Sequence, residues 1–261
     1  MMLKISLVRT LLRAGLSESL GFRLNTIVGV LEKATRLFIL YWFFRAVLPA
    51  ADDVTAVIRY LFVAMLVEAI VRMELIEQMA LKIVTGEATY WLTRPGSPLH
   101  PLFWYTLGKN LPAISICGML LLVGLTGSGG AGGAGIWSGA LGLVAFPCSL
   151  VLAYLLSFYL QYLFGIGVFF TLNSWGTKLL FSALMYLLSG VMFPVEFLPG
   201  ALARLITLLP FHHAVGTPTR VYLGTATLAD GFLQLVWVGI LAATTRFIVR
   251  RCGHHFVTVG G

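Results

Sequence analysis

The residues best suited to chemistry in this sequence are few, and their spacing argues against a catalytic site. His212 and His213 form one adjacent pair, and His254 and His255 form another. A zinc motif of the form H-E-x-x-H needs two histidines four positions apart on one helix face, which adjacent residues cannot supply. Ser128 lies in a glycine-rich tract with no histidine expected beside it, so it lacks a general base. We therefore expect no catalytic residue and no metal site in this chain.

The glycine tract GSGGAGGAG at 127–135 is not a phosphate-binding loop. The pattern G-x-x-x-x-G-K-[ST] requires a lysine followed by a hydroxyl residue, and neither is found at those positions. A tract with almost no side chains is typical of a flexible connection. No nucleotide cofactor is therefore expected on this chain.

Charged residues interrupt two apolar segments near one end of each. Glu32 and Arg36 are four positions apart, as are Glu68 and Arg72, so each couple can form an ion pair along its own helix. Charges at membrane depth are costly and normally face protein or water. Either the first of these segments is buried against other helices there, or its helix starts below the bilayer. Intramembrane ion pairing and snorkelling are favoured over a proton relay.

The elements that must position these residues are membrane helices. Of 261 residues, 59% are hydrophobic and only 11% are charged, against roughly 25% charged in soluble proteins. The mean hydropathy is +0.92, and one helical crossing of a bilayer needs roughly 20 apolar residues. We expect an all-α polytopic membrane protein, with six transmembrane helices in a single domain over 1–261. The net charge of +8 fits basic cytoplasmic loops and contact with membrane lipids, so no nucleic acid is expected as a partner.

The apolar segments predict the order of the elements. An amphipathic helix over 3–20 is expected to lie on the membrane surface. The six spans are predicted at about 26–48, 54–71, 102–126, 136–172, 179–195 and 231–249. The helical pattern of the second span continues through the charged residues that follow it. Residues 80–101 then form a loop of mixed charge.

The segment 193–224 contains short apolar pieces, none long enough to cross a membrane. We expect short re-entrant helices on the outer side, because such segments are tolerated where protein covers their ends. Their boundaries are marked by Pro194, Pro199, Pro210 and Pro218. Most basic residues outside the spans fall on the side that holds the loop 80–101, which places both termini in the cytoplasm.

The order of these features resembles an ABC transporter permease of the exporter-type six-span class. The likeness rests on the loop IVTGEATYWLTRPGSPLHP at 83–101, on SGVMFPVEFLP at 189–199, on LPF at 209–211 and on the P-x-R-x-Y-L-G run at 218–224. A terminal Gly260-Gly261 completes it. The likeness covers essentially the whole chain, with one departure in the long glycine tract at 127–135.

The resemblance implies a permease that uses ATP hydrolysis by a separate ABC ATPase subunit, where ATP and Mg²⁺ bind. A second permease subunit, identical or homologous, would complete the pathway in a bacterial cytoplasmic (inner) membrane. The matched loop residues Gly86, Glu87, Arg94 and Pro95 would contact the ATPase, and Thr93 departs from the family pattern. Export of an amphipathic substrate is the implied function.

An ion-coupled secondary transporter is the alternative. Such a protein needs a titratable residue deep in the bilayer, often beside broken helices in two matching repeats. Glu32 and Glu68 are the candidates, but basic residues lie close to both, and the two halves of the chain show no repeat.

Overall fold

The computed structural model describes residues 2–21, 23–48, 51–84, 99–127, 140–171 and 174–252. All regular elements in these ranges are helical. In chain order they are α1 (Met2–Gly21), α2 (Arg23–Val47), α3 (Ala51–Val71), α4 (Leu75–Val84), α6 (Leu99–Gly127), α7 (Ala140–Thr171), α8 (Ser174–Leu188), the 3-10 helix η1 (Val195–Phe197), α9 (Gly200–Leu208), α10 (Pro210–Tyr222) and α11 (Leu228–Cys252).

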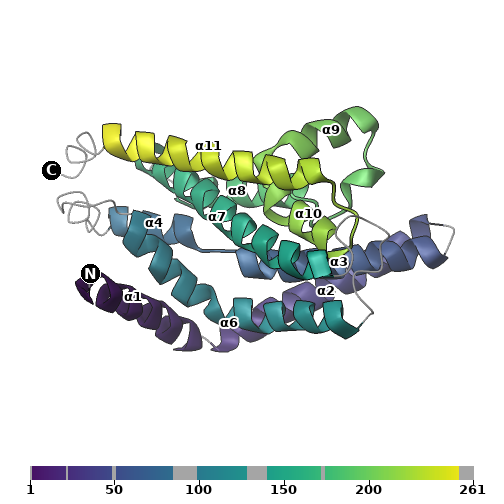
Figure 1. Cartoon of the computed structure of the whole chain (residues 1–261), viewed down its shortest axis with the longest axis horizontal. Coiled ribbons are helices and arrows are strands. Elements are labelled where there is room, and N and C mark those ends of the chain that lie inside the picture. The colour runs from purple at the N-terminus through teal and green to yellow at the C-terminus, as the bar shows by residue number, and fades with distance from the viewer. Residues whose placement is uncertain are drawn as a thin grey trace.

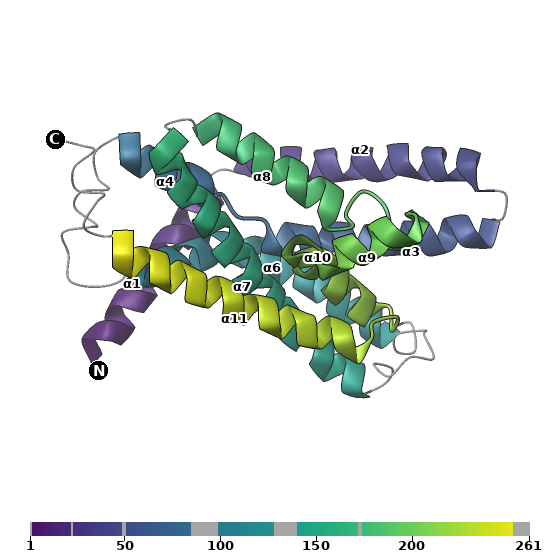
Figure 2. The same ribbon diagram turned by 90° about the horizontal axis from the view of Figure 1, so that it is seen from above.

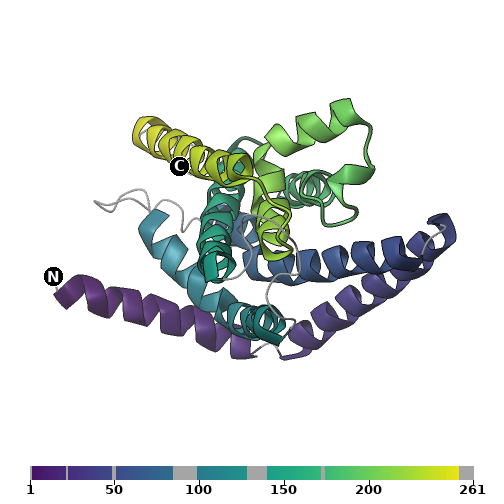
Figure 3. The same cartoon turned by 45° about the vertical axis from the view of Figure 1, so that its right-hand side comes forward.

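Helix α7 is the centre of the bundle and packs against α10, α11, α4, α8 and α3. Its 32 residues run unbroken through Pro147, as the apolar segment 136–172 predicts. Phe146, Leu156 and Leu160 on α7 join Leu61, Val67 and Ile70 on α3 in the main hydrophobic core. Figures 1 and 3 show the other helices arranged around this core, with α1 and α2 on its outside.

In the part of the chain that the structure describes, four segments are long and apolar enough to cross a membrane. They are Asp52–Lys82, Leu99–Gly124, Leu141–Val168 and Leu228–Arg251. Six spans are predicted from the sequence, and α2 and α8 are the two that do not reach this standard. Helix α2 has 25 residues but carries Glu32, Lys33 and Arg36, and α8 has only 15 residues, or about 22 Å of helix.

The two ends of the molecule carry different elements. The start of α1 and the end of α11 lie at one end, whereas the end of α2, the start of α3 and helix α9 lie toward the other (Figures 1 and 2). An even number of crossings would produce this arrangement of the first and last helices.

Helix α1 packs lengthwise on α6, with glycines at the point of closest approach. A Cβ atom on Gly15 would collide with the carbonyl oxygen of Tyr105, and one on Gly108 would collide with the backbone of Leu12. The two backbones therefore touch directly, which only glycine permits at these positions. The apolar side predicted for 3–20 supplies Leu12 and Leu16, which line a shallow groove with Leu111 of α6.

The proline-rich segment 193–224 folds into short helices, as the sequence predicts. Pro194 precedes η1, Pro199 precedes α9 and Pro210 occupies the first turn of α10, positions where a missing N–H costs nothing. Pro218 is predicted as a boundary, and that prediction is wrong, because Pro218 lies inside α10, which is almost entirely buried. The segment therefore contributes to the core through α10, which packs against α7 and α3.

Candidate functional site

The second predicted span breaks where its sequence predicts a continuous helix. Helix α3 ends at Val71 and α4 begins at Leu75, so residues 72–74 are not helical. Backbone groups freed inside a membrane protein need other hydrogen-bond partners. The predicted helix does not continue here because polar side chains of neighbouring helices bind the backbone at the break.

Three such side chains satisfy the backbone at this point. Asn110 of α6 donates from Nδ2 to the carbonyl oxygens of Ile70, at 3.3 Å, and Arg72, at 2.6 Å. Ser157 of α7 donates from Oγ to the Val71 carbonyl oxygen at 2.9 Å. The Leu75 N–H donates to Oε1 of Gln161, also on α7, at 3.3 Å. The break is therefore held by α6 and α7.

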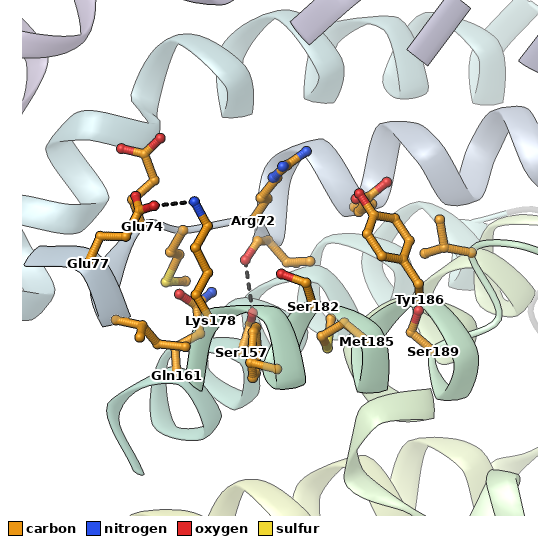
Figure 4. A pocket seen from close by; sticks show the side chains of 16 residues that line it. Arg72, Glu74, Glu77, Ser157, Gln161, Lys178, Ser182, Met185, Tyr186 and Ser189 are labelled. Carbon is orange, nitrogen blue, oxygen red and sulfur yellow. Dashed lines mark hydrogen bonds and ion pairs between the residues drawn. The ribbon is translucent and has the colours of Figure 1, made fainter. Parts of the chain in front are cut away.

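A small polar cavity of about 100 Å³ lies beside the break, between α3–α4, α7 and α8. Figure 4 shows Ser182, Met185 and Tyr186 of α8, and Ser189 directly after it, along one side of the cavity. At about 30 Å³ of liquid volume per water molecule, the space suits a few waters. It is too small for a drug-sized ligand, which needs ~300 Å³ or more.

The four charged residues singled out in the sequence meet here, with their partners exchanged. Arg36 of α2 pairs with Glu68 of α3, and Arg72 pairs with Glu32 of α2 at 3.5 Å. The expected partners were within one helix, Glu32 with Arg36 and Glu68 with Arg72. Both observed pairs instead cross between α2 and α3, because the two helices present these faces to each other.

The two pairs differ in their environment. The side chains of Arg36 and Glu68 are 16% and 10% exposed, whereas those of Arg72 and Glu32 are 52% and 41% exposed. The guanidinium of Arg36 also lies 5.3 Å from the ring centre of Tyr186 on α8, a cation–π distance. Lys33 is a second partner of Glu32, at 3.7 Å. The less exposed pair, Arg36 with Glu68, therefore joins α2, α3 and α8.

Further ion pairs tie α4 to its neighbours, and sequence reasoning missed them. Lys109 of α6 lies 2.8 Å from both Glu18 of α1 and Glu74 at the break. Glu77 of α4 pairs with Lys178 of α8 (Figure 4). The signal in the sequence was the dense run of charges after the second span. Their partners lie on helices distant in sequence, so spacing could not identify them.

A second buried polar network lies in α10 and α11. Gln234 of α11 accepts from Ser149 Oγ at 2.9 Å and donates to the carbonyl oxygens of Ser149, at 3.0 Å, and His213, at 2.9 Å. Nδ1 of His213 lies 2.8 Å from Thr217 Oγ1. This network fixes α10 between α7 and α11.

Ion pairs also fasten the ends of the proline-rich segment. Arg220 lies 3.4 Å from Asp230 of α11 and 3.7 Å from Glu196 of η1. Burial lowers the pKa of His212 on α10 from its usual value to about 3, with a smaller contribution from neighbouring His213. His212 is fully buried and is therefore a neutral structural residue.

The residues expected to contact an ATPase lie outside the described part of the chain. Gly86, Glu87, Arg94 and Pro95 belong to the segment 85–98, which joins α4 to α6. The glycine tract beyond Gly127 and the final Gly260-Gly261 are likewise outside it. The structure does place the helices at both ends of the 85–98 segment.

The break, the crossed ion pairs and the buried α10 describe a membrane protein whose short helices are built into a helical bundle. Comparison with protein families matches residues 31–260 to the model of the ABC-2 family transporter proteins. The chain belongs to the ABC-2 family of transporter permeases. The match begins within α2 and extends past the end of α11, so it includes every candidate span.

Members of the ABC-2 family are typically non-catalytic membrane subunits, and ABC permeases generally pair with ATPase subunits. The resemblance inferred from the loop, the proline-rich segment and their order is thus confirmed at the level of the family. No curated protein matches this ABC-2 permease in sequence.

Proposed function

We propose that this ABC-2 permease is the membrane subunit of an ATP-driven exporter that moves an amphipathic substrate out of the cytoplasm. Membership of the ABC-2 family supports the proposal. ATP and Mg²⁺ bind to a separate ABC ATPase subunit, and a second permease subunit, identical or homologous, completes the pathway. The complex resides in a bacterial cytoplasmic (inner) membrane.

The proposed topology has six spans, with α2 and α8 added to the four long apolar segments, and with α1 on the inner membrane surface. Three observations support it. Helix α8 lies against α7 and α10 in the bundle, and two charged residues of α2, Glu32 and Arg36, pair with Arg72 and Glu68. The start of α1 and the end of α11 at one end of the molecule fit two cytoplasmic termini (Figure 1). The helices η1, α9 and α10 then form the outer re-entrant segment.

We propose that α4 couples ATP hydrolysis to transport. The observation that carries this proposal is the position of α4 next to the segment 85–98. Helix α4 leads directly into 85–98, where Gly86, Glu87, Arg94 and Pro95 contact the ATPase. It is tied to α8 through Glu77 and Lys178. A displacement of the docked loop would therefore move several helices, because α4 is also joined to α6 and α7 through the hydrogen bonds at the break.

A different lysine, on α6, extends the movement to the N-terminal helix. Lys109 joins Glu74, at the start of α4, to Glu18 of α1. Helices α1, α4 and α6 thus respond together at the end of the molecule that faces the ATPase in the proposed orientation.

The experiment co-purifies the permease with its ATPase and compares ATP hydrolysis with transport in reconstituted vesicles. In the double variant Glu87→Gln/Arg94→Gln, hydrolysis should no longer drive transport. The matched control is Arg45→Gln/Asp53→Asn, which changes one basic and one acidic residue near the α2–α3 junction. Normal assembly and coupling in the loop variant would refute the proposed contact.

The ion-coupled secondary transporter has less support. Glu68, one of its two candidate carboxylates, is already paired with Arg36 and is therefore not a free carboxylate. Flux driven by a pH gradient in vesicles that contain the purified permease alone would nevertheless establish that alternative.

A further inference from the structure

A groove on the side of the bundle has features that the export function does not use. It lies between α6 and α11, over α7, and has a volume of about 430 Å³. That volume falls in the range of ~300–1,000 Å³ typical of ligand sites. The groove lies beside the last turns of α11, whose terminal helical residue is Cys252.

The floor of the groove is aromatic. Phe103 of α6 makes edge-to-face contacts with Phe158 and Tyr154 of α7, at centroid distances of 5.2 and 6.1 Å. Trp104 and Tyr159 extend the apolar lining on the two helices. Trp104 donates its indole N–H to His100 at 3.1 Å, which fixes the ring at the groove. Such a surface suits a hydrocarbon chain.

The rim of the groove is basic. Arg246 and Arg250 line it, four positions apart on α11, and both are exposed. No ion pair involves either arginine in the described part of the chain, where Glu18, Glu74 and Glu77 are bound to lysines. Arg251 is directed elsewhere, over the ring of Phe247 at 5.1 Å. Among the described residues, the rim therefore carries two positive charges that no carboxylate pairs with.

Arg246 and Arg250 lie near the end of a candidate membrane span. The apolar segment of α11 extends from Leu228 to Arg251, so Arg246 lies more than one helical turn before its last residue. A guanidinium at this end of a span lies near the lipid headgroups, where an anion or water accompanies it. Phosphate matches the forked geometry of guanidinium and is the anion that a membrane offers there.

We propose that this groove binds one anionic phospholipid, with its phosphate between Arg246 and Arg250 and an acyl chain along Phe103 and Phe158. The charge of the rim selects an anionic headgroup, and the aromatic floor requires a lipid rather than a soluble phosphate. In the proposed orientation this lipid belongs to the inner leaflet, and that leaflet assignment rests on the proposed function.

The experiment measures lipid retention by the full-length permease alone, so failure of ATPase coupling does not affect it. Purified protein is equilibrated with equal amounts of phosphatidylglycerol and phosphatidylcholine, and bound lipid is counted by native mass spectrometry. The wild type should retain one phosphatidylglycerol. Arg246→Gln/Arg250→Gln should lower the preference for phosphatidylglycerol by about tenfold or more. Arg246→Lys/Arg250→Lys keeps the charge but not the forked geometry, so it should lower the preference by less.

Two controls separate this site from general attraction to charge. Arg9→Gln/Arg13→Gln removes two exposed arginines with the same spacing from α1 and should retain the lipid. Glycerol phosphate, a headgroup without acyl chains, should not displace it. Equal loss in both glutamine variants, displacement by glycerol phosphate, or no retention by the wild type would each overturn the proposal.

Discussion

Arg36 of α2 and Glu68 of α3 form a largely buried ion pair between two helices whose sequences each offer a partner one turn away. Removal of one member leaves the other charge uncompensated, which in buried pairs costs about 3–5 kcal/mol. Because both side chains keep some solvent contact, we expect Glu68→Gln to lower the free energy of unfolding by about 2 kcal/mol or more. Thermal unfolding in detergent, with a double-mutant cycle that includes Arg36→Gln, measures this coupling.

The exposed pair between Arg72 and Glu32 provides the comparison. Its solvent exposure predicts a contribution of about 1 kcal/mol or less for Glu32→Gln. Salt should weaken this contribution more than that of the buried pair. Equal losses in the two variants would contradict the distinction drawn from burial.

The hydrogen bond from Ser157 to the Val71 carbonyl should stabilise the break between α3 and α4. Ser157→Ala leaves a buried acceptor without this donor, and we expect a loss of about 1–3 kcal/mol in stability. Ser115→Ala is the matched control, because Ser115 is exposed and bonds only within its own helix, to Pro112. Denaturant unfolding, followed by tryptophan fluorescence, would measure the stability of both variants. If Ser115→Ala were as destabilised as Ser157→Ala, the Ser157 hydrogen bond would not be what stabilises the break.

The glycine contact between α1 and α6 predicts a steric effect on the N-terminal helix. Gly108→Ala places a methyl group against the Leu12 backbone, and we expect a cost of about 1–3 kcal/mol, with faster proteolysis of α1. At Gly29 of α2 an added Cβ meets nothing, so Gly29→Ala should be neutral or slightly stabilising. Limited proteolysis of the two variants under identical conditions tests the contact.

His212 predicts an acid dependence of stability. Burial lowers the pKa of His212 to about 3, so below its unfolded value of 6.5 the unfolded chain binds a proton that the folded chain does not. The neutral ring therefore contributes its full stability above about pH 6.5, and that contribution falls as the pH decreases toward 3.

The slope from this one group approaches about 1.4 kcal/mol per pH unit. In His212→Leu the acid dependence of the unfolding midpoint between about pH 6.5 and 4.5 should become shallower. His100→Leu, at an exposed histidine, should retain the slope of the wild type. An unchanged slope in His212→Leu would show that the ring is accessible to protons.

The sequence by itself determined the class of this protein and much of its order along the chain. Apolar segments of crossing length require a bilayer, and the prolines at 194, 199 and 210 begin the short helices η1, α9 and α10, because a proline without an N–H suits a first turn. Order along the chain also carried the resemblance to ABC permeases, since that likeness depends on local motifs.

The tertiary structure alone decided the partners. Arg36 and Glu68 are 32 positions apart, and Lys178 and Glu77 are 101 apart, so no helical period relates them. The break at 72–74 depends on Asn110, Ser157 and Gln161, whose side chains reach the backbone at the ends of α3 and α4 only after α6 and α7 have packed. Helical spacing reports neighbours one turn away, whereas a bundle brings together side chains from different helices, and the stronger contacts of this protein are of that second kind.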